Sequence, residues 1–458
     1  MKSVIAGWIL LGTPFPLPAE DPVYSRDIAP ILNQHCVICH RPNDVAPMSL
    51  MTYKEARPWA AAIRQAVITR TMPPWHADPH VGQFANDARL SETDISTINA
   101  WAKSGAKEGD PALTPPPPQL PEGWHIKPDK ILTFPEPHLV HASTADEYAY
   151  IYVPTHFTED MWVQAAEVLP GDKRVVHHST VSVMKPNQLP KQLLPSGEAL
   201  IPREDKYRYG TGKVMHIRPE VPVQDDGCAA AGGGALPGED PQPGSFLSIF
   251  LPGHGAEVRP PGYAIKVPAG AVLQFQTHYS NRTGKDIVDS TKIGLVFAKS
   301  PVEHEILQYE IWNNMFALTP GDANHRVTSC FTLDRDVMAL AYTAHMHFRG
   351  KSMMTEATFP DGHKQVLFSV PHYDFRWQET YMLKDPEFIP KGTRLMTTAY
   401  FDNSANNPLN PDPTRRIRWG EPSDEEMMGF WLSFTPAKAA ANPLNAAARS
   451  KSSELKQQ

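Results

Sequence analysis

The chain has 458 residues, with 43 Lys and Arg against 50 Asp and Glu, and a formal net charge of −7. This length exceeds one ordinary core and indicates two or three domains. The mild acidity gives no electrostatic attraction to nucleic acid or to an anionic membrane surface, so neither partner is expected. The 47 prolines suit turns, edge strands and linkers, and predict that most of the chain is strand and loop.

Residues 1–19 have the pattern of a secretory signal peptide. Lys2 precedes a short apolar run over residues 4–11, and cleavage is expected after Ala19. The run is shorter than the roughly 20 apolar residues that span a bilayer, and no other segment is apolar enough to do so. A buried N-terminal strand is the alternative. We expect a periplasmic or secreted protein without stable membrane insertion.

Residues 20–110 are predicted to form a small all-α domain. Apolar residues recur at helical spacing over residues 53–69, and those on one face are Ala60, Ile63, Ala66 and Val67. The segment Ser91–Asp94 has the sequence of a helix start. The apolar stripe that follows it consists of Ile95, Ile98, Trp101 and Ala102.

Cys36-Val-Ile-Cys39-His40 is the C-x-x-C-H motif by which c-type haem is attached. Two thiols on one helical turn reach the two vinyl groups of one porphyrin, and the adjacent histidine becomes an axial ligand of the iron. A zinc half-site would need two further ligands nearby, and a redox C-x-x-C would lie in a βαβ context. We therefore predict a cytochrome c-like domain with one covalently bound haem c.

The sixth iron ligand is predicted to be Met72, in a Met-Pro-Pro loop between the two helices. The two prolines favour an irregular loop against the haem face, and Met–His ligation raises the reduction potential. Met48 lies only eight residues beyond His40, which is short for reaching the opposite face. His76 and His80 remain alternatives.

Residues 111–121 form a proline-rich linker, expected to be a stiff and extended polyproline spacer. After it the pattern changes to strand-like runs separated by turn residues: Glu147–Val153, Val175–Val176, Ala271–Phe275, Lys292–Phe297 and Val337–Tyr342. We predict two all-β sandwich lobes, jelly-roll-like, over residues 122–290 and 291–436. A disordered tail is expected over residues 437–458.

Four cysteines occur in the chain, and the two outside the haem motif are Cys228 and Cys330. In an oxidising compartment this pair can form a disulfide that closes a long loop. Two unrelated buried thiols are the alternative, and the sequence leaves this choice open.

Three groups of histidines stand out in the predicted β region: His177-His178, His278, and His345-Met-His347. Residues i and i+2 of a strand project to the same face, so His345 and His347 can share one metal ion. Adjacent His177 and His178 point to opposite faces of a regular strand. They can bind one ion only at a strand end or a bulge.

Together these groups resemble the copper type II, ascorbate-dependent monooxygenases, the group of dopamine β-monooxygenase and peptidylglycine α-hydroxylating monooxygenase, over roughly residues 122–436. That family carries a His-His pair, a histidine in a Leu-Gln…His-Tyr setting, a His-x-His motif and a methionine in Glu-Met. The matching positions, in the same order, are His177 and His178, His278, His345 and His347, and Met427, with Met428 a neighbouring alternative.

The resemblance implies two copper sites. His177, His178 and His278 would hold an electron-transfer copper, and the copper that binds oxygen would be held by His345, His347 and Met427. Imidazole suits copper in either oxidation state, and a thioether favours Cu(I), the state that reacts with oxygen.

This chain also departs from the peptide-amidating member of that family. An arginine two residues before the His-x-His motif grips the substrate carboxylate there, and Thr343 occupies that position here. The asparagine and tyrosine after the ligand methionine are replaced by Gly429 and Trp431. Without the bidentate partner for a carboxylate, a peptide-glycine substrate is not expected, and Trp431 favours a more apolar or aromatic pocket.

We therefore expect a copper-dependent monooxygenase that hydroxylates a C–H bond of a small-molecule substrate with O2. The reaction consumes two external electrons, which would come from a periplasmic electron donor through the haem to the His177/His178/His278 copper. One alternative is a non-catalytic periplasmic protein for electron transfer or copper binding. The other is a copper–haem dehydrogenase, in which electrons leave through the haem.

Overall fold

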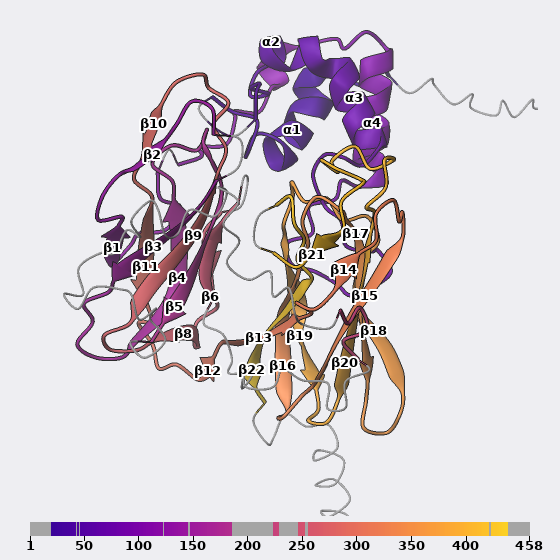
Figure 1. Ribbon diagram of the computed structural model, residues 1–458. Coiled ribbons are helices and arrows are strands. Elements are labelled where there is room, and N and C mark those ends of the chain that lie inside the picture. The colour runs from indigo at the N-terminus through magenta and orange to yellow at the C-terminus, as the bar shows by residue number, and fades with distance from the viewer. Residues whose placement is uncertain are drawn as a thin grey trace, which may run out of the picture.

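The computed structural model describes residues 20–437 except 43, 45, 122, 145–146, 186–222, 229–245, 252–254 and 421–422. The expected signal peptide, and the expected tail apart from Ala437, lie outside the described residues. Figure 1 shows helices at the N-terminal end of the described chain, followed by strands gathered into two lobes. No helix in the described ranges is long and apolar enough to cross a membrane.

The N-terminal segment is helical, as predicted. Its elements are η1 (Tyr24–Ile28), α1 (Ala29–His35), α2 (Tyr53–Ala56), η2 (Arg57–Trp59), α3 (Ala60–Ile68), α4 (Glu92–Lys103) and η3 (Pro111–Leu113). The helix expected over 53–69 is interrupted by the 3₁₀ turn η2, which contains Pro58, because proline lacks the N–H that an α-helix interior requires. The predicted start of α4 is a capping box, in which Ser91 and Asp94 bind each other's backbone N–H.

One apolar core holds these helices together, and we call the helices with this core the helical module. Tyr24 of η1 packs against Tyr53 and Trp101, at ring-centroid distances of 5.4 and 6.3 Å. Trp101 and Ile98 of α4 are fully buried, as the predicted apolar stripe requires. Cys36 packs at the edge of the same core.

The N-terminal lobe is a sandwich of two sheets around a valine-rich core. One sheet has the strand order β1-β11-β4-β8-β12, with β7 beside β4, the other has the order β3-β9-β5-β6, and β10 pairs with β2. The strands are β1 (Lys130–Thr133), β2 (His138–Val140), β3 (Glu147–Pro154), β4 (Met161–Leu169), β5 (Val176–Met184), β6 (Phe246–Phe250), β7 (Glu257–Val258), β8 (Tyr263–Val267), β9 (Val272–Tyr279), β10 (Ile287–Asp289), β11 (Lys292–Phe297) and β12 (His304–Glu305).

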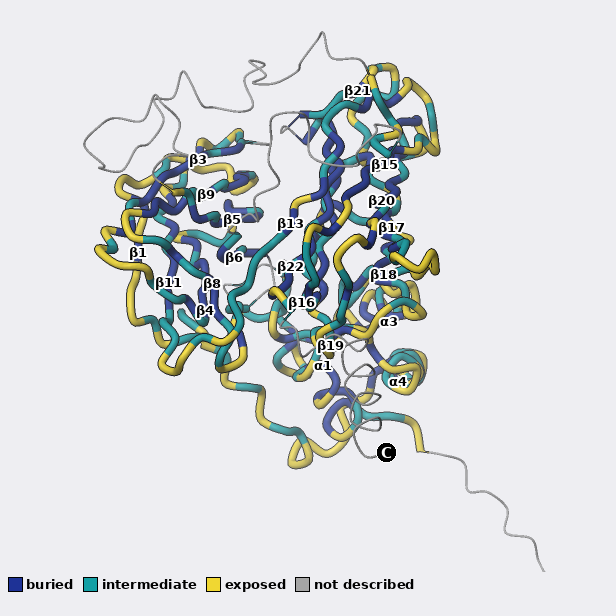
Figure 2. Tube along the Cα trace, turned by 90° about the horizontal axis from the view of Figure 1, so that it is seen from below, coloured by how far each residue is buried: buried dark blue, intermediate teal, exposed yellow. Residues whose placement is uncertain are grey.

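The C-terminal lobe is a second sandwich, with sheets of order β13-β22-β16-β19 and β15-β20-β17-β18 and a β14–β21 pair. Figure 2 shows that the strands of both lobes are mostly buried or partly buried, while exposed positions gather in the loops between them. The strands are β13 (Leu307–Trp312), β14 (Ala317–Leu318), β15 (His325–Thr332), β16 (Val337–His345), β17 (Gly350–Thr358), β18 (Lys364–Val370), β19 (Thr380–Ile389), β20 (Arg394–Phe401), β21 (Ile417–Arg418) and β22 (Gly429–Pro436).

The boundary between the lobes differs from the expected division after residue 290. Strand β11 pairs with β4 and β1, and β12 pairs with β8, so both strands belong to the N-terminal lobe. The C-terminal lobe begins at β13. A strand-like run in the sequence indicates that a strand forms but not which sheet it joins. The boundary after residue 290 was expected from domain size alone.

The helical module is docked on the C-terminal lobe by residues 75–88. Trp75 and Phe84 are buried in the core of that lobe, with ring centroids 4.9 and 5.5 Å from Tyr381 of β19. The backbone of the same segment pairs with the edge of β19, where the N–H of Ala85 donates to the carbonyl of Met382 at 2.7 Å. This strand addition satisfies backbone groups that an edge strand would otherwise expose.

The predicted linker does not act as a free spacer. Asn33 Nδ2 donates to the carbonyl of Pro116 at 3.3 Å, and Arg41 donates to the carbonyl of Pro121 at 3.3 Å. Leu120 packs against the core of the helical module. The linker therefore lies along the module.

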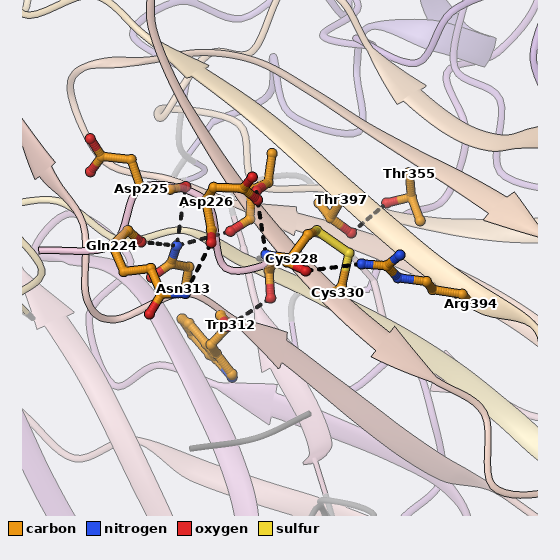
Figure 3. Close-up of a disulfide and its surroundings, with 12 residues drawn as sticks. Gln224, Asp225, Asp226, Cys228, Trp312, Asn313, Cys330, Thr355, Arg394 and Thr397 are labelled. Atoms are coloured by element: carbon orange, nitrogen blue, oxygen red, sulfur yellow. Dashed lines mark hydrogen bonds between the residues drawn. A yellow bond between two sulfur atoms is a disulfide. The ribbon is translucent and has the colours of Figure 1, made fainter. Parts of the chain in front are cut away.

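Cys228 and Cys330 form the disulfide that the sequence left open, with an S–S distance of 2.02 Å. Figure 3 shows that the bond ties the described segment 223–228 to β15. Asn313 Nδ2 donates to the carbonyls of Thr328 at 2.9 Å and Gln224 at 3.0 Å, so hydrogen bonds hold the same segment. The disulfide therefore fastens this segment to the C-terminal lobe.

We expect the double variant Cys228→Ser with Cys330→Ser to unfold more easily. The bond closes a loop of 102 residues, and chain entropy assigns about 4–5 kcal/mol to a loop of that length. Urea unfolding, followed by the tryptophan fluorescence of the non-reduced wild type and the variant, measures the difference. The wild type under reducing conditions is the matched control. A loss below about 1 kcal/mol would show that the hydrogen bonds alone secure the segment.

Candidate metal centres

The first histidine cluster lies on two paired strands of the N-terminal lobe. His178 of β5 is directly opposite His278 of β9. The register of β5 shifts between Val176 and His178, so His177 occupies a bulge. The ligand nitrogens of His177, His178 and His278 lie within 4.8 Å of one another. The sequence allowed both members of a His-His pair to share one ion only at a strand end or a bulge, and a bulge is present.

The environment of His178 keeps its imidazole in the metal-binding form. Burial, helped by the neighbouring rings of His278 and His177, holds the pKa of His178 well below its usual value. A neutral imidazole has a lone pair for a metal ion. Tyr148 stacks on His278 with centroids 4.4 Å apart, and its hydroxyl is 2.9 Å from Ser423 Oγ of the C-terminal lobe. These contacts fix the ring and join the two lobes beside the cluster.

The second pair, His345 and His347, comes together at the end of β16. His345 is the last residue of the strand and His347 lies in the following turn, with ring centroids 5.1 Å apart. His345 Nδ1 is 2.7 Å from Gln378 Oε1, and His347 Nδ1 is 3.3 Å from the carbonyl of Glu425. A ring that donates through Nδ1 presents the lone pair of Nε2. Both histidines are therefore prepared to bind one ion through Nε2.

Glu426 joins the backbone on either side of this site. Its carboxylate accepts from the backbone N–H of His347 at 2.8 Å, of Arg349 at 2.6 Å and of Met427 at 3.2 Å. Burial raises the pKa of Glu426 to about 8. The chain segments that carry His347 and Met427, far apart in sequence, are therefore fastened to one side chain. Sequence reasoning used Glu426 only as part of the Glu-Met motif and missed this role.

An aromatic surface lies next to His345. Trp312 and Trp431 are at centroid distances of 6.4 and 5.9 Å from the His345 ring, and the two indoles are 4.7 Å apart. Gly429 makes this packing possible, because a Cβ there would be 2.7 Å from the Trp312 ring. Gly429 and Trp431, the two replacements noted in the sequence, thus both contribute to the packing around the Trp312 ring.

Phe375 lies between the two histidine clusters. Its ring centroid is 5.9 Å from His177 and 6.4 Å from His278 of the N-terminal lobe. It is also 5.7 Å from His347 of the C-terminal lobe. The two clusters therefore face one another across a single buried ring. Nothing in the sequence near Phe375 indicates this position, because its neighbours come from distant segments.

The C-x-x-C-H motif follows α1 directly. Cys36 is the C-cap of the helix, and the backbone N–H groups of Cys39 and His40 donate to the carbonyl of Cys36 at 3.2 and 2.9 Å. The two thiols are not joined to each other. Burial is the main cause that raises the pKa of Cys36 to about 12 and of Cys39 to about 11.

His40 and the methionines of the module occupy distinct places. His40 Nδ1 is 3.3 Å from the carbonyl of Met48, which leaves Nε2 for a metal. Met48 packs against the helical core, together with Cys36. Met72 is half-buried just after α3, where its backbone N–H donates to the carbonyl of Ala66 at 3.4 Å. His76 donates through Nδ1 to the carbonyl of His372 at 2.7 Å, so its ring faces the C-terminal lobe.

Comparison with protein families places the second cluster in context. Residues 311–449 match the family described as copper type II ascorbate-dependent monooxygenase, C-terminal domain. Most of the C-terminal lobe is therefore similar to the C-terminal domain of that family. The match includes His345, His347 and Met427 and begins within β13, close to the lobe boundary found in the fold. The family consists of oxidoreductases, so the predictions of an enzyme and of copper chemistry are confirmed at that level.

Solved structures show only weak similarity to this chain. Two structures of PNGF-II are similar at TM-scores of 0.24, with 10% and 12% identity over 67% and 66% of this chain. This chain spans only 60% and 59% of those chains. A Bacillus subtilis oxalate decarboxylase is similar at a TM-score of 0.14, with 8% identity over 71% of this chain and 81% of that chain. No curated protein matches the chain.

Proposed function

We propose that the protein is an exported copper-dependent monooxygenase that hydroxylates a C–H bond of a small organic substrate with O2. We further propose that its electrons enter through a c-type haem bound by the helical module. The observation that carries the proposal is the pair of histidine clusters facing one another across Phe375, one of them within the residues that match the copper monooxygenase family.

His177, His178 and His278 would hold one copper ion, and His345, His347 and Met427 the other. Bound copper supplies one-electron redox chemistry and activation of oxygen.

The protein's own groups prepare these sites. Gln378 and the carbonyl of Glu425 set the tautomers of His345 and His347. Glu426 fixes the backbone of both ligand segments of the second site. Phe375 is only 4% exposed, and its ring lies between the two clusters.

Cys36 and Cys39 would form the thioether bonds to haem, and His40 would bind the iron through Nε2. The positions of these residues fit the group, since the thiols follow one helix end and the His40 ring is oriented by the Met48 carbonyl. Haem supplies a one-electron carrier. Met72 remains our proposal for the sixth ligand.

The surface beside His345 favours a substrate without a carboxylate. Thr343, at the position of the family's carboxylate-binding arginine, is 3.0 Å from the hydroxyl of Thr380. Glu310 of β13 lies opposite Trp431 of β22, and its carboxylate accepts from Trp312 Nε1 at 3.2 Å. An acidic and aromatic surface repels a carboxylate and accommodates a neutral or cationic ring compound.

The disulfide and the N-terminal sequence support export. A disulfide that ties β15 to a distant segment persists in an oxidising compartment. The pattern of residues 1–19 provides a route to that compartment. We therefore propose a periplasmic or secreted location and a periplasmic electron donor.

Metal analysis tests the proposal directly. Mass spectrometry for copper, beside a pyridine haemochrome assay, is expected to give two copper ions and one haem per chain. One haem without copper after reconstitution would contradict the monooxygenase. Stoichiometric rather than catalytic oxygen consumption would favour the non-catalytic alternative, and oxygen-independent substrate oxidation would favour the dehydrogenase.

A further inference from the structure

The loop over residues 371–379, which connects β18 to β19, contacts the second histidine site through Gln378. Gln378 Oε1 is 2.7 Å from His345 Nδ1, and its Nε2 donates to the carbonyl of Phe375 at 3.3 Å within the same loop. The side chain is buried. Because the His345 ring has its Nδ1 partner in this loop, the position of the loop sets the orientation of that ring.

The same loop holds the backbone between the two histidines of the His-x-His motif. The hydroxyl of Tyr373 donates to the carbonyl of Met346 at 2.7 Å and accepts from its N–H at 3.1 Å. The Tyr373 ring lies so close to Gly350 that a Cβ there would be 2.9 Å from it. Phe375 of the loop separates the two clusters. One loop therefore orients a ring, a backbone segment and the partition between the sites.

The helical module contacts the other side of this loop. His76 Nδ1 donates to the carbonyl of His372 at 2.7 Å. Asn86 binds the first residues of β19, which follow the loop directly. Its side chain donates to the carbonyl of Thr380 at 2.7 Å and accepts from the N–H of Met382 at 3.0 Å. The module thus binds the loop itself and the first residues of β19.

The haem-attachment motif lies at the same junction. Burial raises the pKa of Cys39, and so do the carboxylates of Asp44 and of Glu379, the last residue of the loop. Asp44 also forms a 3.1 Å ion pair with Lys173, which precedes the bulge at His177 in the N-terminal lobe. The segment just after the motif therefore contacts the N-terminal lobe close to its histidine cluster.

We propose that Gln378 is a positioning residue for the His345 site and that docking of the helical module holds the 371–379 loop in place. The module is then a structural part of the metal centre, in addition to any electron transfer it performs. The inference rests on the proposed function for its copper chemistry. The contacts it describes exist in the metal-free protein. Mutations can test the role of Gln378 and the role of module docking separately.

The first test concerns Gln378 and compares Gln378→Met with Gln378→Glu. Methionine is similar in size, and its thioether is only a weak acceptor for His345 Nδ1–H, whereas glutamate is a strong one. Cu(II) affinity at one of the two sites is expected to fall by about 10–100-fold in Gln378→Met, the usual loss when the partner of a metal-binding histidine is removed. Gln378→Glu is expected to restore the affinity to within about threefold of wild type, with an EPR spectrum close to wild type.

A metal-free measurement accompanies this test. Selective ¹⁵N-histidine NMR of the full chain reports which ring nitrogen of His345 carries the proton. Wild type and Gln378→Glu are expected to show the Nδ1–H tautomer, and Gln378→Met a mixture. An unchanged tautomer and an unchanged copper affinity in Gln378→Met would overturn the role of Gln378.

The second test separates the module from the loop with Asn86→Ala, which removes two hydrogen bonds to β19. Asp87→Ala is the matched control, because Asp87 is adjacent to Asn86 and pairs with Arg89, two residues further along the chain. Asn86→Ala is expected to accelerate hydrogen exchange of residues 371–386 at least threefold and to weaken Cu(II) binding at the His345 site. Asp87→Ala is expected to leave both unchanged.

The outcomes distinguish this inference from the proposed function. Wild-type protein that binds no copper would contradict the proposed function, while the histidine tautomer and the hydrogen exchange would still decide the inference. Accelerated exchange in Asn86→Ala with an unchanged His345 tautomer and unchanged copper affinity would show that the module covers the loop without positioning the site.

Discussion

Replacing His345 with alanine is expected to abolish substrate-dependent oxygen consumption and to reduce the copper content from two ions to one. The variant loses one of three proposed ligands and the ring that Gln378 orients. The remaining imidazole and thioether do not form a site that retains copper at working concentrations. The haem spectrum of the module is expected to remain as in wild type, since the C-x-x-C-H motif lies outside the C-terminal lobe.

His363→Ala is the matched control for this prediction. His363 belongs to the same lobe, is exposed, and pairs with Asp361 at 2.6 Å in the turn before β18. Oxygen consumption and copper content are measured side by side in both variants. Full turnover in His345→Ala would refute the assignment of this cluster as the oxygen site. Equal losses in both variants would indicate general destabilisation.

Features that depend on local spacing could be predicted from the sequence. The helix over 53–69 and the capping box at Ser91 follow from residues within a few positions of one another. The meeting of His345 and His347 was expected from their spacing, although His347 lies beyond the end of the strand. The strand run at 292–297 was expected too, but its sheet was not, because pairing partners are remote in sequence.

Features that depend on remote contacts could not be predicted. No role was expected for Trp75 or Phe84, yet both pack in the core of the C-terminal lobe against Tyr381. Phe375 and Gln378 belong to no motif, and their importance comes from histidines on other strands. The residue type alone does not indicate such a role, because the role of a phenylalanine or glutamine in a loop depends on neighbours that are remote in sequence.

The double variant Cys36→Ala with Cys39→Ala is expected to lose all covalent haem and all turnover driven by the physiological donor. Thioether bonds to the porphyrin require both thiols, and His40 alone does not retain the group through purification. Copper content is expected to stay at two ions per chain. Docking of the module depends on Trp75 and Phe84 rather than on the cysteines, so the 371–379 loop should remain in place.

Three measurements make this variant informative: the haemochrome assay, copper analysis, and hydrogen exchange of residues 371–386. Loss of haem with wild-type hydrogen exchange and wild-type copper content would show that the variant removes electron supply without disturbing the 371–379 loop. Under those conditions, rescue of turnover by ascorbate would show that the copper sites also accept electrons from solution, as the family's name implies. Undiminished turnover with the physiological donor would show that electrons reach the copper without the haem, and the module would then serve the positioning role alone.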